Sequence, residues 1–225
     1  VTIPIANDTT LDGGSVQLEA QATGGAFAAI GAAVNIGAGD LGNSVTASAP
    51  DTDIEALDDF GEGDTLTFRA VITDAAGNST TGANSGDTLT VDQVAPTISS
   101  IDSPTANGAY NAGATIDVRV NFSENVTLSG GTLDATLDTG VTVNIGAFGP
   151  ASSGTGTYTI SGGENSGDLT VTSDPLTLSG ATLRDDAGND ATLSIPAVNN
   201  LDDNAALVVD TTAPAAFTTW HDDAS

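Results

Sequence analysis

Residues 115–122 read TIDVRVNF, with apolar and polar side chains in strict alternation. Side chains of a β-strand point alternately to its two faces, so this stretch predicts a strand with one buried and one solvated face. Its apolar residues are Ile116, Val118, Val120 and Phe122, and its polar residues are Asp117, Arg119 and Asn121. Half-buried strands of this kind are typical of β-sandwiches.

The rest of the chain has the same character. Thr, Ser and Gly are abundant, aromatic residues make up 4%, and short runs rich in Val, Ile and Thr recur throughout. This composition predicts an all-β fold with little helix, and the regular spacing of the runs argues against the disorder that the high charge alone would suggest. Strands are expected at 15–21, 44–48, 65–73, 88–92, 97–101, 114–122, 131–137, 141–145, 156–160, 168–172, 176–180, 191–195 and 206–210. The stretch 26–37 (AFAAIGAAVNIG) would permit a short helix through its alanines, but its glycines favour a strand.

Segments rich in Gly, Asn, Asp and Ser separate these runs and are expected to form turns or loops. In the second half of the chain they are 107–113, 123–125 (SEN), 129–131 (SGG), 138–140, 149–156 (GPASSGTG), 161–167 and 185–189.

Two motifs occur twice. DAAGN at 74–78 returns as DDAGN at 185–189, and VDQVAP at 91–96 returns as VDTTAP at 209–214. Both recurrences have nearly the same spacing, about the length of one immunoglobulin-like domain. The sequence therefore predicts two tandem immunoglobulin-like β-sandwich domains, at 1–94 and 95–212. The remaining residues, 213–225, would be the start of a third unit or a tail.

Charge restricts the partners of the protein. Thirty acidic residues oppose three arginines, and Lys is absent, so the net charge is −27. Such a charge repels nucleic acid and anionic membranes and attracts cations. Most of the acid is Asp, which favours turns over helices, so the negative charge is expected mainly in loops.

Cys and Met are absent, which excludes disulfides and thiol chemistry. The only His is His221, near the end of the chain, so neither domain can form a His-based catalytic triad or zinc site. No apolar run is long enough to span a membrane. Because Val1 is not an initiator residue, we expect a mature form or a fragment of a longer protein.

The second half carries FSENVTLSGGTL from Phe122, then DDAGN and finally VDTTAP. This order resembles the immunoglobulin-like repeats of giant bacterial surface proteins and adhesins. The first half shares only its later portion, from DTLTFRAVITDAAGN to VDQVAP. The resemblance implies tandem β-sandwiches without enzymatic activity, secreted and located at the cell surface, often stiffened by calcium between domains.

The repeated Asp-x-Ala-Gly-Asn turn has the chemistry of a Ca²⁺ site. It offers a carboxylate, an amide oxygen and exposed backbone within five residues, and Ca²⁺ takes six to eight oxygen ligands. In an immunoglobulin-like topology, 123–125 and 185–189 lie at the pole where the linker arrives. The predicted ligands there are Asp92, Glu124, Asp185 and Asn189. The alternative is that both motifs are simply tight turns.

The same reasoning gives sites at both ends of the chain. Asp74 and Asn78 of the first domain would face a preceding unit or another copy of the chain, and Asp210 would face a following unit. The predicted partners are therefore neighbouring repeats or copies of the same chain, with no nucleic acid and no membrane insertion.

These features favour a non-enzymatic spacer, or a filament or surface-layer building block, stiffened by Ca²⁺. One alternative is an adhesin module that binds surface glycans. Another is an accessory domain of a large extracellular enzyme whose catalytic residues lie elsewhere.

Overall fold

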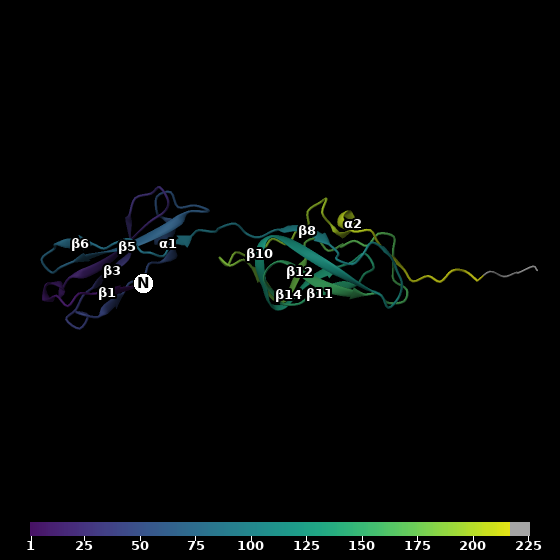
Figure 1. The fold of residues 1–225 in the computed structure, drawn as a ribbon, viewed down its shortest axis with the longest axis horizontal. Helices are drawn as coiled ribbons and strands as arrows, with labels where there is room; N and C mark the ends of the chain where they lie inside the picture. Colours follow the sequence, from purple (N-terminus) through teal and green to yellow (C-terminus); the bar gives the residue numbers. More distant parts are fainter. Residues whose placement is uncertain (217–225) are drawn as a thin grey trace, which may run out of the picture. The chain divides into compact units, whose positions relative to one another are not determined.

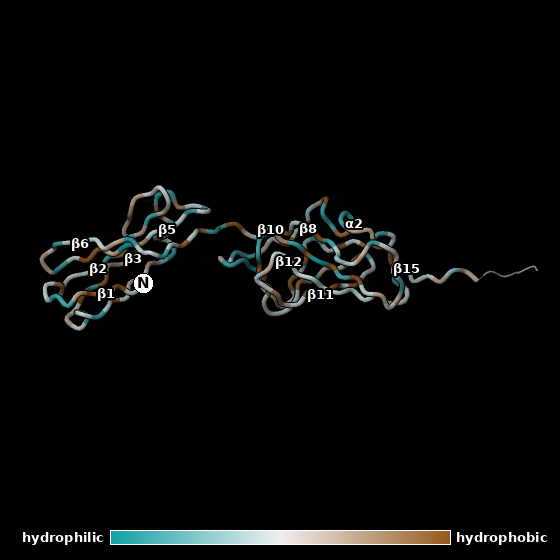
Figure 2. The backbone as a smooth tube through the Cα atoms, in the orientation of Figure 1, coloured by the Kyte–Doolittle hydropathy of each residue, from teal (hydrophilic) through white to brown (hydrophobic). Residues whose placement is uncertain are grey.

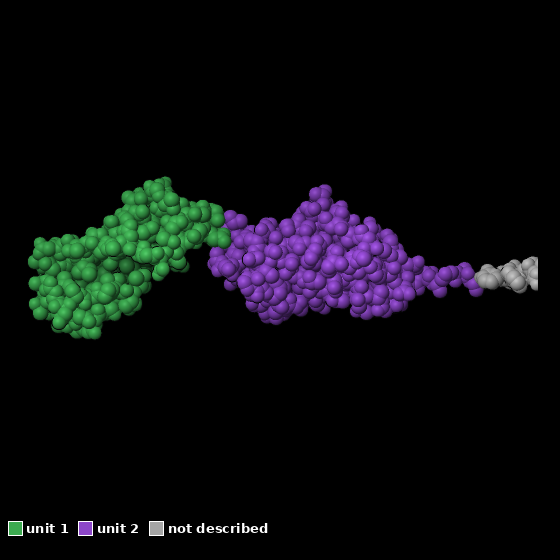
Figure 3. Space-filling view, viewed as in Figure 1, with its two compact units in different colours: residues 1–93 green, residues 94–225 purple. Residues whose placement is uncertain are grey.

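A computed structural model describes residues 1–216 of the chain, which form many strands and little helix (Figure 1). The chain divides into two compact units, Val1–Gln93 and Val94–Ser225 (Figure 3). Strands far outnumber helices among the described residues, and the helices are short, so the prediction of a β-rich chain with little helix is confirmed. Most strand pairs are antiparallel. None of the helices in the described range is long and apolar enough to cross a bilayer. Residues 217–225, most of the predicted tail, lie outside the described range.

Unit 1 is built around a sheet in the order β3-β2-β5-β6, with β7 also paired to β5 and a separate β1-β4 pair. Its strands are β1 (Thr2–Pro4), β2 (Ser15–Gln21), β3 (Ala28–Asn35), β4 (Ser44–Thr46), β5 (Thr65–Thr73), β6 (Ser79–Thr81) and β7 (Leu89–Thr90). Two short helical turns complete it, η1 (Thr9–Leu11) and α1 (Asp51–Glu55). The strand interpretation of 26–37 is thereby confirmed, because β3 occupies most of it.

The core of unit 1 follows from the alternation along β2. Val16, Leu18 and Ala20 are buried, while the residues between them are half exposed. They pack with Ile30 of β3 and Leu66 of β5 in one apolar cluster. Figure 2 shows hydrophobic and hydrophilic residues interspersed along the backbone of this unit.

Unit 2 contains a five-stranded sheet centred on β10, which pairs with β8, β11, β12 and β14, and a three-stranded sheet in the order β13-β15-β9. Its strands are β8 (Ile98–Asp102), β9 (Gly108–Tyr110), β10 (Thr115–Thr136), β11 (Thr142–Ile145), β12 (Phe148–Thr159), β13 (Asn165–Ser166), β14 (Thr177–Arg184) and β15 (Leu207–Asp210). One short helix, α2 (Leu201–Asn204), precedes β15.

The apolar face predicted for 115–122 is the centre of the unit 2 core. Ile116, Val118 and Val120 are fully buried, and Phe122 is 5% exposed. They share one cluster with residues of the smaller sheet, including Leu207 and Val209 of β15. Two sheets therefore contribute to one core.

Three predicted turns are wrong. Residues 123–125 and 129–131 lie inside β10, which continues for 22 residues, and β12 begins at Phe148 and includes all of 149–156. Two more are wrong in part, because β9 lies within 107–113 and β13 lies within 161–167. The pairing of β10 with β12 shifts register between Asn121 and Val126, so an irregularity absorbs the polar triplet without ending the strand.

Two predicted strands are also wrong. Residues 168–172 and 191–195 contribute only isolated bridges, Leu137 to Val171 and Thr97 to Thr192. Both stretches nevertheless place apolar side chains in the core or against it. Their alternating pattern therefore reflects burial of one side of the chain, without the pairing of a β-strand.

Candidate metal centre

Each copy of the repeated motif folds into the same hydrogen-bonded turn. In unit 1 the turn connects β5 to β6, and one oxygen of Asp74 accepts hydrogen bonds from the backbone N–H groups of Ala76 (2.9 Å) and Asn78 (2.8 Å). The other oxygen accepts from the side-chain amide of Asn78 at 2.9 Å. The carboxylate therefore closes its own turn, as Asp does in Asx turns.

The second copy follows β14 and has nearly this pattern, with one backbone donor at the third residue after the Asp rather than at the second. Oδ1 of Asp185 accepts from the backbone N–H groups of Gly188 (2.7 Å) and Asn189 (2.8 Å), and Oδ2 accepts from the amide of Asn189 (2.8 Å). Asp185 is only 8% exposed, one of two polar residues that are this deeply buried in the part of the chain described. Its carboxylate is therefore held in one orientation.

The glycine of each motif has the positive φ expected of it. Gly77 has φ 93° and Gly188 has φ 99°, a region that L side chains rarely adopt. The chain reverses there without steric cost, which brings the Asn back to the Asp.

The two turn carboxylates have lowered pKa values, for causes of different weight. The side-chain amide and then the backbone N–H of Asn78 lower the pKa of Asp74. Burial is the largest influence on Asp185 and raises its pKa, but the hydrogen bonds from Asn189, Gly188 and Ala187 together outweigh burial and leave the pKa below its ordinary value. Both groups are therefore carboxylates at neutral pH.

The first residues of unit 2 are attached to the same end of the unit as the Asp185 turn. The backbone carbonyl of Pro96 accepts from Thr192 N–H at 2.7 Å, and Thr97 bridges to Thr192. Thr97 also exchanges hydrogen bonds with Ser123 of β10, through its carbonyl and its N–H. This stretch therefore runs between β10 and the segment that follows the Asp185 turn.

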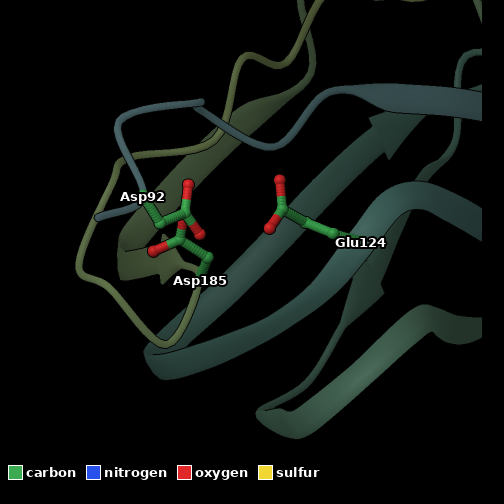
Figure 4. A group of neighbouring side chains, drawn as sticks. All are labelled: Asp92, Glu124 and Asp185. Atoms are coloured by element: carbon green, nitrogen blue, oxygen red, sulfur yellow. The ribbon is translucent and has the colours of Figure 1, made fainter. Parts of the chain in front are cut away.

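Asp92, two residues before unit 2 begins, joins Glu124 and Asp185 in an acidic group. Each offers a carboxylate oxygen, and these oxygens all lie within 4.8 Å of one another. Asp92 and Glu124 are half-buried, and Asp185 is buried. Figure 4 shows the carboxylates of Asp92 and Asp185 next to each other, with Glu124 extending toward them from its strand. Glu124 comes from the irregular part of β10, not from the loop in which the sequence analysis placed it.

Three carboxylates this close repel one another. Two unit charges about 5 Å apart repel by about 1 kcal/mol in water and about 3 kcal/mol near a protein surface. A bound cation would convert this repulsion into attraction. The group could therefore hold a metal, and its donors are all oxygen, which suits a hard cation.

The other predicted ligands are placed differently. The side-chain N–H groups of Asn189 donate to Asp185 and, at 3.5 Å, to the backbone carbonyl of Val94. Asn189 therefore lies beside the acidic group and holds the carboxylate of Asp185 in place. Asp74 and Asn78 lie in the unit 1 turn, and Asp210 ends β15 and accepts from Thr212 N–H at 2.8 Å. Within residues 1–216, none of these three belongs to a group of three or more Asp, Glu, His or Cys side chains.

Ser123 and Thr97 were not predicted. They attach the connecting segment, residues 92–97, beside Glu124. Both are ordinary polar residues of a Thr- and Ser-rich chain, so no sequence signal distinguishes them.

No protein-family model matches the chain, and no curated protein is significantly similar to it in sequence.

Proposed function

We propose that the chain is a non-enzymatic structural module of an extracellular repeat protein. It acts as a spacer, or as a filament or surface-layer building block, in adhesion or cell-surface assembly. Its units are immunoglobulin-like β-sandwiches, and Ca²⁺ at Asp92, Glu124 and Asp185 restricts the motion of the connecting segment.

One observation carries the proposal: three carboxylates that are far apart in the sequence gather where the connecting segment meets the first strands of unit 2. Asp92 lies in that segment, next to the last residue of unit 1, whereas Glu124 and Asp185 belong to unit 2. A cation bound by all three would tie the segment to unit 2. Without it, the repulsion among the carboxylates favours looser states of the segment.

Ca²⁺ fits this donor set better than the common alternatives. Three carboxylates provide three to six oxygen ligands. The amide oxygen of Asn189, backbone carbonyl oxygens and water can complete the six to eight oxygen ligands that Ca²⁺ takes. Mg²⁺ demands stricter octahedral geometry, and zinc sites use Cys or His, of which the chain has no Cys and a single His. The spacer role itself is supported by the β-rich fold, the repeated turn and the strong negative charge.

Calorimetric titration with CaCl₂ tests the metal site. Glu124→Gln removes a ligand charge without touching the turn and should weaken Ca²⁺ binding by about tenfold or more, since charge count is a main determinant of affinity. The matched control is Asp186→Asn, an exposed neighbour in the same turn that is outside the acidic group. Equal Ca²⁺ affinity in Glu124→Gln and Asp186→Asn would refute the site.

Asp185→Asn tests the double role of that residue. It should weaken Ca²⁺ binding and also lose the hydrogen bond from the Asn189 amide. Asp74→Asn removes the same bond from the other turn and separates the two effects, because Asp74 lies outside the acidic group.

Small-angle scattering of the unmodified chain with and without CaCl₂ tests the spacer role: the distribution of chain dimensions should narrow with Ca²⁺. If Ca²⁺ binds but the distribution is unchanged, the metal site stands and the spacer role fails.

A further inference from the structure

Unit 1 contains a cavity of about 430 Å³. Leu18, Ile30 and Leu66 line its floor and are only 3%, 2% and 5% exposed, so the cavity reaches the core of the unit. Two half-buried aromatic rings, Phe60 and Phe68, also line it. A volume of a few hundred Å³ with mostly apolar walls is typical of small-molecule sites.

The mouth of this cavity is acidic. Asp51 and Glu55 lie one helical turn apart on α1, both are exposed, and both line the cavity. Neither side-chain carboxylate forms a hydrogen bond or ion pair with any residue among 1–216. Their neighbour Asp53 accepts a hydrogen bond from Gly31 N–H of β3 at 2.7 Å, which attaches α1 to the sheet. The two free carboxylates are therefore held over an apolar pocket.

This combination selects a ligand with an apolar body and a positive charge. The body would displace water from the apolar floor, and the charge would lie between the two carboxylates. Phe60 and Phe68 add faces on which an ammonium group is attracted by the ring quadrupole. Neutral ligands would gain only the first of these contributions, and anions would be repelled.

A second copy of this chain is a poor source of that charge. Lys is absent, and each of the three arginines already has a carboxylate partner: Arg69 with Glu19 at 2.6 Å, Arg119 with Asp102 at 2.8 Å, and Arg184 with Asp190 at 2.6 Å. Using one of them would break an existing ion pair. The arginines of a second copy are therefore unfavourable sources of this cation.

We propose that the unit 1 cavity binds small organic cations, ammonium compounds with an aryl or alkyl body, through Asp51, Glu55 and the apolar floor. This activity is independent of the Ca²⁺ site, because no residue of the acidic group lines the cavity.

Three probes of one shape test the proposal: 4-phenylbutylammonium, 4-phenylbutan-1-ol and 4-phenylbutanoate. Each is titrated into the full chain and followed by the amide NMR signals. The ammonium compound should bind about fivefold or more tighter than the alcohol, with shifts centred on the signals of Leu18, Ile30 and Leu66, and the carboxylate should bind weakest. Equal affinity of the ammonium compound and the alcohol would overturn the charge argument.

The net charge of −27 attracts any cation, so variants must separate the pocket from the general field. Asp51→Asn with Glu55→Gln should weaken binding of the ammonium probe about fivefold. Asp58→Asn with Asp59→Asn removes the same charge from exposed residues that do not line the cavity and should leave that affinity unchanged. Equal weakening in both pairs would show attraction by the net charge only and refute the site.

Ala49→Leu tests the cavity by volume. Ala49 lines the cavity, so the larger side chain should fill part of its volume. The binding affinities of all three probes should then fall by the same factor. A thermal melt checks that the variant folds. Unchanged binding in the folded variant would place the ligand elsewhere.

Discussion

Two aspartates with closely similar local hydrogen bonds differ at the residue scale in what surrounds them. Asp74 and Asp185 each accept from two backbone N–H groups and from the Asn four residues later. Only Asp185 is joined by Asp92 and Glu124. Five residues therefore specify the turn, whereas residues from distant parts of the chain specify the acidic group.

The turn glycine should be sensitive to substitution for a backbone reason. Gly188 has φ 99° and open space around it, so Gly188→Ala is opposed by conformation rather than by collision. We expect the free energy of unfolding to fall by about 1 kcal/mol or more in urea denaturation. Gly162→Ala is the control, because a Cβ there would also meet open space and no positive φ opposes it. If both variants lose the same stability, the positive φ is not the cause.

Asp134 of β10 should contribute stability that depends on pH. Its carboxylate accepts from Ser179 (2.5 Å), Thr132 (2.6 Å) and Asn144 (2.7 Å), and these bonds, that from Ser179 first, lower its pKa below the ordinary 3.8. A lowered folded-state pKa means that the contribution is complete above the ordinary value and is lost as pH falls through the lower one.

Asp134→Ala should therefore cost about 1 kcal/mol at neutral pH, a modest figure because the carboxylate is half exposed. The stability difference from the unmodified chain should shrink well below pH 3.8. Urea denaturation at both pH values measures it, and Asp168→Ala, an exposed carboxylate outside this network, is the control. A stability difference that stays constant through acid pH would contradict the role given to the charge.

At the scale of elements, β10 organises unit 2. It pairs with four other strands and continues through Gly130 and Gly131, where the sequence suggested a turn. Gly130 has φ 92° and pairs with Ala181 of β14, and the neighbouring residue of that strand, Gly180, has φ 66°. Glycines on both partners let the ladder bend without ending, as at other β irregularities.

Gly131 is required by close approach rather than by φ. A Cβ there would overlap the carbonyl oxygen of Ser179 in the paired strand. Gly131→Ala should therefore push β14 away from β10 and lower the free energy of unfolding by about 3 kcal/mol. Gly146→Ala is the matched control, because a Cβ there meets nothing within 4 Å. Comparable stability of the two variants in denaturant would show that the strands can separate at little cost.

What the sequence could predict followed from local physics. Alternation identified the buried face of 115–122, and Asp, Gly and Asn identified the two turns, because strand period and turn conformation depend on a few neighbouring residues. Glu124 was expected in a loop because SEN reads as polar and turn-like. Its place in β10 depends on pairing with β8 and β12, which is not local information. The same limit applies to 191–195, whose alternation predicts a strand although the stretch forms only an isolated bridge.

On the scale of the whole molecule, the charge is so large that general and specific effects of cations must be separated. With a net charge of −27, any salt should stabilise the folded chain by screening repulsion among its carboxylates. A cation that binds the acidic group stabilises further, by about 2.7 kcal/mol at a concentration one hundred times its dissociation constant. Screening depends on ionic strength alone, whereas site binding depends on the identity of the ion.

Thermal melts at constant ionic strength should therefore separate the two. Replacing NaCl by CaCl₂ should raise the melting temperature of the unmodified chain, and MgCl₂ should raise it less, since Mg²⁺ gives up its water reluctantly. Glu124→Gln should lose most of the Ca²⁺-specific rise but keep the general effect of salt, because one charge among thirty acidic residues barely changes the screening. Asp186→Asn removes the same single charge beside the site and should keep both effects. If Ca²⁺ raises the melting temperature equally in the two variants, the stabilisation comes from the charge of the molecule as a whole, and the three gathered carboxylates hold no ion of their own.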